Sequence, residues 1–187
     1  MSTTTEEIDV FATSWKLTAS VAVDAPADQV YGMVSDITRM GEWSPECLGG
    51  KWTSGTPGQE GARFHGFNRE GEAEWTSQSE VVTAVSPREF EFTVMAFCPG
   101  QPDENTQWVT GSQPGDMTWS FRVEENGSGC VLTQTHTMKL VGPFYRLLLE
   151  GVEESERSEN VQNRKEHLQH SMESTLAKLK SVAEQGN

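Results

Sequence analysis

Possible chemistry in this sequence centres on His136, which lies in the β-rich segment of residues 130–140. An unperturbed imidazole has a pKa of ~6.5, so this side chain can act as a general acid or base. Successive side chains of a strand point to opposite faces. The face that we expect to point inward holds Leu132, Gln134, His136, Met138 and Leu140. His136 is therefore either a catalytic group or a buried, hydrogen-bonded side chain that sets the polarity of a pocket.

Arg63 is the second candidate for chemistry, in the predicted strand of residues 61–69. The period of two places Arg63 and His65 on one face, with Phe64 and Asn68 on the other. The pattern does not decide which face points inward. The alternative interpretation of Arg63 is an exposed arginine on the surface of a sheet.

Aromatic and polar side chains on the other predicted elements could line a cavity. On the strand of residues 72–85 we expect the face of Trp75 and Ser77 to point inward. Each aromatic residue is about as well explained by core packing as by ligand contact, and inside a cavity the two roles overlap. The other expected lining residues are Tyr31, Trp43, Phe64, Asn68, Phe92, Trp119, Phe121, Gln134, His136 and Met172.

The elements that must position these residues follow from hydrophobic periodicity and turn signals. We expect a first strand over residues 15–23, then a short helix starting near Pro26 and a second one over residues 37–42. Six further strands are predicted over residues 48–54, 61–69, 72–85, 89–97, 117–125 and 130–140. A long, polar loop of residues 98–116 interrupts them, with Trp108 as a possible lid residue.

The last predicted element is a long helix over residues 158–184. Its apolar stripe consists of Val161, Leu168, Met172, Leu176, Leu179 and Ala183. One amphipathic helix cannot cover a flat sheet of this size, so the sheet should curve around it. The sequence thus predicts an α+β fold: a curved antiparallel sheet of about seven strands on a C-terminal helix, with room for a cavity.

Several segments, in this order and spacing, resemble the polyketide cyclase/dehydrase and lipid-transport family of the START/Bet v 1-like (SRPBCC) superfamily. The resemblance is carried by residues 25–31 (APADQVY), 34–36 (VSD), 42–46 (EWSPE), 61–64 (GARF), 68–69 (NR), Trp75 and 170–180 (HSMESTLAKLK). It implies a helix-grip fold with a deep cavity under the terminal helix. It also implies that an Arg or Asn of the 61–69 strand, here Arg63 or Asn68, contacts a ligand carbonyl or enolate.

Composition excludes several partners. The chain of 187 residues has a net charge of −14, which repels phosphate backbones, so nucleic acid is not an expected partner. No apolar run approaches the ~20 residues that span a bilayer, so no integral membrane association is expected. We expect a flexible leader over residues 1–13 and a single domain over residues 14–187. Oligomeric state is not predicted.

The three cysteines, Cys47, Cys98 and Cys130, are far apart and show no zinc-ligand spacing. We expect free thiols in the cytoplasm, with no metal and no cofactor. The acidic N-terminal segment does not resemble a signal peptide. No nucleophile elbow, phosphate-binding loop or zinc-protease motif is present in the sequence.

Three functions remain open on these grounds. The first is the binding or carriage of a small hydrophobic molecule, such as a lipid or an aromatic polyketide-like compound. The second is a polyketide cyclase or aromatase acting on a poly-β-ketone, with an Arg or His assisting enolisation or loss of water. The third is a protein-interaction module of the helix-grip type.

Overall fold

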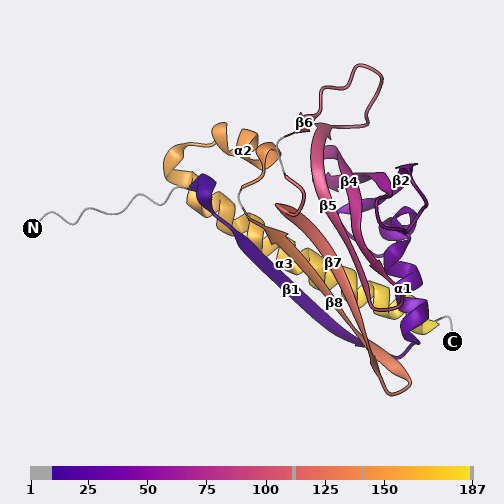
Figure 1. The fold of residues 1–187 in the computed structure, drawn as a ribbon. Coiled ribbons are helices and arrows are strands. Elements are labelled where there is room, and N and C mark those ends of the chain that lie inside the picture. The colour runs from indigo at the N-terminus through magenta and orange to yellow at the C-terminus, as the bar shows by residue number, and fades with distance from the viewer. Residues whose placement is uncertain (1–9, 111–112, 140, 186–187) are drawn as a thin grey trace, which may run out of the picture.

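One antiparallel sheet and one long helix dominate the protein (Figure 1). The computed structural model describes residues 10–110, 113–139 and 141–185. The strands are β1 (Trp15–Val23), β2 (Cys47–Ser54), β3 (Arg63–Glu70), β4 (Ala73–Val85), β5 (Glu89–Pro99), β6 (Val109–Thr110), β7 (Met117–Asn126) and β8 (Gly129–Met138). Their spatial order is β1-β8-β7-β5-β4-β3-β2, with the short β6 paired to β5. All neighbouring pairs are antiparallel.

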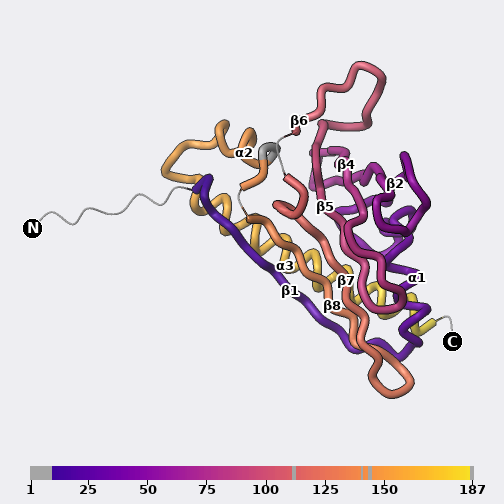
Figure 2. The backbone as a smooth tube through the Cα atoms, viewed as in Figure 1, coloured from indigo at the N-terminus to yellow at the C-terminus, as the bar shows by residue number. Residues whose placement is uncertain are grey.

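The sheet is strongly curved, and register shifts show where. Between β4 and β5 the pairing shifts twice, leaving Met95 on β5 and Val82 on β4 without an opposite residue. Two more shifts interrupt β2 against β3. Because a bulge bends its strand and increases its twist, these sites let the sheet wrap around the helix, as the tube in Figure 2 shows.

Two short helices connect β1 to β2. The first, α1 (Ala27–Ser35), begins after Pro26, whose fixed φ suits a helix start. The second, the 3₁₀ helix η2 (Ile37–Glu42), is capped by the Asp36 side chain, which accepts a hydrogen bond from the Thr38 amide at 3.1 Å. Both helices match the predicted positions.

The long terminal helix, α3 (Glu154–Gln185), begins four residues before the predicted start at residue 158. Glu154 and Glu156 lie in its first turn, where carboxylates stabilise the helix dipole. The predicted apolar stripe is confirmed, since all six of its members are buried. A further helix, α2 (Pro143–Glu150), precedes α3 in a segment for which no element was predicted.

α3 packs closely along β1, at one edge of the sheet (Figure 1). Gln169 donates to the Thr18 carbonyl at 3.2 Å, and the Lys180 ammonium donates to the Ala22 carbonyl at 2.7 Å. Contacts of α3 with β2 and β3, at the other edge, are few. The helix and the concave face of the sheet therefore enclose a space, which is the helix-grip arrangement expected from the sequence.

Two segments differ from the prediction. Val10–Ala12, in the expected flexible leader, form the 3₁₀ helix η1, and the Phe11 ring lies 4.5 Å from the Arg146 guanidinium; residues 1–9 lie outside the described residues. In the long loop, Trp108 does not cover the cavity. Its ring lies 5.1 Å from that of His65, on the outer face of β3, and the loop then returns to the sheet as β6, which pairs with β5.

Candidate ligand cavity

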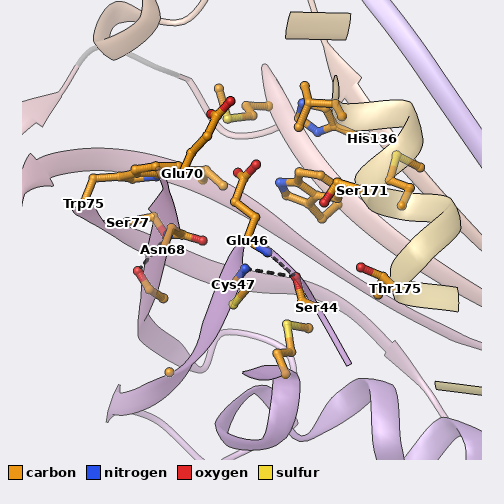
Figure 3. Close-up of a pocket in the computed structure, with 18 of the residues that line it drawn as sticks. Ser44, Glu46, Cys47, Asn68, Glu70, Trp75, Ser77, His136, Ser171 and Thr175 are labelled. Carbon is orange, nitrogen blue, oxygen red and sulfur yellow. Dashed lines mark hydrogen bonds between the residues drawn. The ribbon is translucent and has the colours of Figure 1, made fainter. Parts of the chain in front are cut away.

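A cavity of about 480 Å³ lies between the concave face of the sheet and α3 (Figure 3). This volume falls within the range typical of small-molecule sites. Apolar and aromatic side chains from β1, β3, β4, β5, β7, η2 and α3 make most of its wall. Its exposed lining residues are Glu70, Ala73, Glu74 and Leu148, so the cavity opens between the β3–β4 hairpin and α2.

Most of the residues predicted from the sequence lie in the wall of this cavity. They are Trp43, Phe64, Asn68, Trp75, Ser77, Phe92, Trp119, Phe121, Gln134, His136 and Met172. Their contact with a ligand stays a prediction, but their convergence on one cavity is a property of the fold.

The structure decides which face of β3 points inward. Phe64, Gly66 and Asn68 line the cavity. Gly66 allows a close approach, since a Cβ atom there would lie 2.9 Å from the Ser77 hydroxyl oxygen on β4 and would force that side chain to move. The Ser77 hydroxyl and the Asn68 amide both donate to the Gly66 carbonyl, at 3.4 and 3.1 Å. This small, polar stretch leaves room in the wall between the aromatic rings.

Two predicted residues lie away from the cavity. Arg63 is on the outer face of β3, where its side chain is 67% exposed and forms an ion pair with Glu80 at 2.7 Å. It cannot reach a ligand in the cavity, because strand alternation turns it away from Phe64. Tyr31 is buried in the packing of α1 rather than in the lining, and burial raises the pKa of its hydroxyl.

His136 is held rigidly in the wall. Its Nδ1 lies 3.0 Å from the Thr118 carbonyl oxygen, and its ring stacks on Trp119 with centroids 4.1 Å apart and an interplanar angle of 17°. A carbonyl only accepts, so Nδ1 carries the proton and donates; in the neutral ring Nε2 then has a free lone pair. Burial lowers the pKa of His136 to about 4, although the bond to Thr118 opposes this shift. His136 is therefore a neutral hydrogen-bond acceptor near pH 7.

Polar atoms next to His136 are not satisfied by the protein. Among the described residues, the Trp15 indole N–H and the Gln134 Oε1 atom are buried without a hydrogen-bond partner, as is the Ser79 hydroxyl. Trp15 and Gln134 both line the cavity, and the Trp15 ring meets His136 edge-on with centroids 6.2 Å apart. Because buried polar groups normally have hydrogen-bond partners, it is unusual for this wall to contain two polar atoms without one.

An ion cluster that the sequence did not reveal closes part of the opening. The Arg164 guanidinium of α3 donates to both Glu46 carboxylate oxygens at 3.0 and 3.1 Å, and to Glu70 at 2.6 Å. His167, one turn along α3, lies 3.6 Å from Glu46 and 3.4 Å from Glu70. These groups are far apart in sequence, and only the placement of α3 across the β2–β3 edge brings them together.

The cluster has the donor atoms of a cation site, since ligand atoms of Glu46, Glu70 and His167 lie within 4.8 Å of one another. Arg164 already pairs with both carboxylates, however, which makes the group an ion-pair network. Tyr145 of α2 also lines the opening, and burial raises the pKa of its hydroxyl to about 12. That hydroxyl donates to the Asn160 side chain at 2.7 Å, which ties α2 to α3.

All three cysteines are free thiols. Cys47 lines the cavity, and burial raises the pKa of its thiol to about 11. A thiol with so high a pKa is a poor nucleophile near neutral pH. Within the described residues, no helix combines the length and apolar character that crossing a membrane would require.

Comparison with known proteins agrees with this architecture. The model of the family described as polyketide cyclase / dehydrase and lipid transport matches residues 14–184, and the chain belongs to that family. No curated protein sequence matches the chain.

Several solved structures share the fold. The polyketide cyclase-like protein Cgl2372 of Corynebacterium glutamicum is 27% identical, with a TM-score of 0.60 and 91% of each chain covered. The di-domain aromatase/cyclase BexL of the BE-7585A biosynthetic pathway is 19% identical with a TM-score of 0.57; the match covers 91% of this chain and 50% of BexL. The major latex-like protein 151 of Panax ginseng is 11% identical with a TM-score of 0.57, covering 91% of this chain and 97% of that one.

Proposed function

We propose that this protein binds or carries a small hydrophobic molecule in the cavity between its sheet and α3. The observation that carries the proposal is the cavity itself: about 480 Å³ of space that the protein does not fill, lined mainly by apolar and aromatic side chains. A ligand that buries roughly 300 Å² of apolar surface there gains about 7 kcal/mol before the cost of association. That gain supports useful affinity without any charged contact.

A cyclase or aromatase is the second candidate, favoured by the likeness to the aromatase/cyclase BexL. The cavity supports it less well. His136 has a pKa near 4 and is a weak general base at neutral pH. Arg63 lies outside the cavity, and Arg164, at the opening, is already paired with two carboxylates. No free cation of the described lining could stabilise an enolate.

The proposed setting is the cytoplasm. Three free thiols, two of them fully buried, are typical of a reducing compartment. A hydrophobic compound held in the cavity would be kept out of water during its passage through that compartment.

Native mass spectrometry of the freshly purified protein, followed by solvent extraction, tests the proposal. We expect an apolar adduct at one molecule per chain. The variant Ser77→Phe places a ring in the cavity and should abolish the adduct, because Ser77 is a buried lining residue. Ser20→Phe is the matched control: the same change at an exposed position of β1 should leave the adduct in place.

A protein that never shifts in mass, even with added lipids or aromatic compounds, would contradict the proposal and favour a protein-interaction module. An adduct that survives Ser77→Phe in a folded variant would place the ligand elsewhere. Turnover of an added poly-β-ketone that His136→Gln abolishes, with binding retained, would favour the cyclase instead.

A further inference from the structure

The cavity offers no countercharge to an anionic ligand. Among its described lining residues the only arginine or lysine is Arg164, and it is shared by Glu46 and Glu70. The third acid of the lining, Glu74, forms an ion pair with Arg69, which is not part of the cavity lining. The opening therefore has two carboxylates, Glu46 and Glu70, for one arginine, and His167 also lies within 3.6 Å of both of them. A carboxylate that entered would lose its hydration without gaining a cation.

The wall formed by β1 and β8, in contrast, offers hydrogen-bonding groups to a hydroxyl group of a ligand. Since the Nδ1–H of His136 donates to the Thr118 carbonyl, Nε2 is left as an acceptor, and the stack on Trp119 holds the plane of the ring. The neighbouring Gln134 adds a second buried acceptor that has no partner in the described protein. The Trp15 indole N–H of the same wall is a buried donor without a partner among the described residues. A hydroxyl group can donate to one of the acceptors and accept from such a donor, so the wall favours a ligand that brings an O–H group.

We infer that the cavity selects an uncharged aromatic molecule carrying a hydroxyl group, which donates to His136, and that it rejects carboxylates. This inference rests on the proposed function, because it names the class of ligand for the same cavity. We infer an aromatic ligand because aromatic rings, among them Trp43, Trp75 and Phe92, line the wall and stack well on a flat molecule. Figure 3 shows Trp75 opposite His136.

Four probes with one ring system test the inference by isothermal titration calorimetry at pH 7. They are naphthalene, 2-naphthol, 2-methoxynaphthalene and 2-naphthoate. We expect 2-naphthol to bind about tenfold more tightly than naphthalene, as one buried hydrogen bond allows. 2-Methoxynaphthalene, which has the oxygen but no donor, should lack this advantage. 2-Naphthoate should bind more than about tenfold more weakly than naphthalene.

Variants of the acceptor separate its role from simple packing. His136→Phe keeps a ring in the wall but removes the acceptor, so 2-naphthol should lose its advantage while naphthalene still binds. His136→Gln should restore the advantage, because its amide can donate to the Thr118 carbonyl and leave an oxygen free. If His136→Phe does not fold, the ranking of the four probes on the unmodified protein still tests the preference for a hydroxyl group, and His136→Gln tests the acceptor.

A second pair of variants tests the rejection of carboxylates. Glu70→Gln removes one partner of Arg164, so 2-naphthoate should bind severalfold more tightly than it does to the unmodified protein. Glu80→Gln removes the partner of Arg63 on the outer face and should change nothing.

Equal affinities for 2-naphthol, 2-methoxynaphthalene and naphthalene would overturn the hydroxyl preference while leaving a ligand-binding cavity. Equal or tighter binding of 2-naphthoate would overturn the exclusion of carboxylates. Failure of all four probes to bind would count against the proposed function itself, and this inference would fall with it.

Discussion

His136 illustrates how one side chain acquires its properties from its surroundings. A histidine in water titrates near pH 6.5, but in this wall the pKa is about 4, because the buried ring cannot be hydrated when charged. The bond from Nδ1 to Thr118 then fixes the tautomer. Of the two interpretations that the sequence left open, the geometry favours the buried histidine that sets pocket polarity.

The shifted pKa has a consequence for stability. Between about pH 6.5 and pH 4 the unfolded chain binds a proton at His136 that the folded protein does not bind, so stability rises with pH through this window. Acidification from pH 7 to pH 4 should thus remove about 3 kcal/mol of the free energy of unfolding. Urea unfolding at a series of pH values measures this loss.

The control for this prediction is His136→Gln, which can keep the hydrogen bond but does not titrate. Its free energy of unfolding should fall less steeply between pH 6.5 and pH 4 than that of the unmodified protein. Parallel curves for the two proteins would show that His136 is not the titrating group.

At the scale of elements, the ion cluster joins α3 to the far edge of the sheet. The helix is held along β1 by packing and hydrogen bonds, whereas its contacts with β2 and β3 are few. Arg164 bridges that gap to Glu46 and Glu70 across the cavity opening. Its side chain is 20% exposed and that of Glu46 is 13% exposed, so the pair is shielded from solvent.

Loss of this bridge should be costly. Arg164→Met keeps much of the side-chain volume but leaves the shielded Glu46 carboxylate beside that of Glu70 and the ring of His167, without its arginine, so we expect the free energy of unfolding to fall by about 3 kcal/mol. Arg69→Met, which breaks the exposed pair with Glu74, should cost less than about 1 kcal/mol. Urea denaturation of both variants gives the comparison, and equal losses would mean that the cluster does not hold α3.

The inward face of a strand could be predicted from its sequence only as far as the first β-bulge. The alternation along β8 placed Gln134 and His136 inside, as the burial pattern confirms. On β5 we expected Phe92 to point inward, and both it and Val94, two residues further along, are buried and line the cavity. Beyond them, the extra residue Met95 shifts the register, so that Phe97 also lines the cavity. A bulge depends on pairing with a neighbouring strand, which a single segment does not reveal.

For the whole molecule, the net charge of −14 affects stability as well as partners. Like charges repel more strongly in the compact state than in the extended chain, and added salt screens this repulsion. Compared with a buffer of low ionic strength, we expect sodium chloride at physiological or moderately higher ionic strength to raise the melting temperature by about 2–4 °C. Differential scanning calorimetry measures the shift.

Choline chloride at matched ionic strength is the control for specific ion binding and should have the same effect as sodium chloride. A melting temperature that falls with salt would show that local ion pairs, such as the cluster of Arg164, outweigh the general repulsion.

The sequence by itself determined the order of the elements, the inward faces of most strands and the apolar stripe of α3, because these depend on local periodicity and turn residues. It also supplied the family resemblance that the match over residues 14–184 bears out. Tertiary structure alone decided that Arg63 faces outward, that Trp108 folds over the outer face, and that Arg164 meets Glu46. Those outcomes depend on curvature and on which edge of the sheet α3 approaches. Side chains more than a hundred residues apart are then brought together by geometry that no local pattern contains.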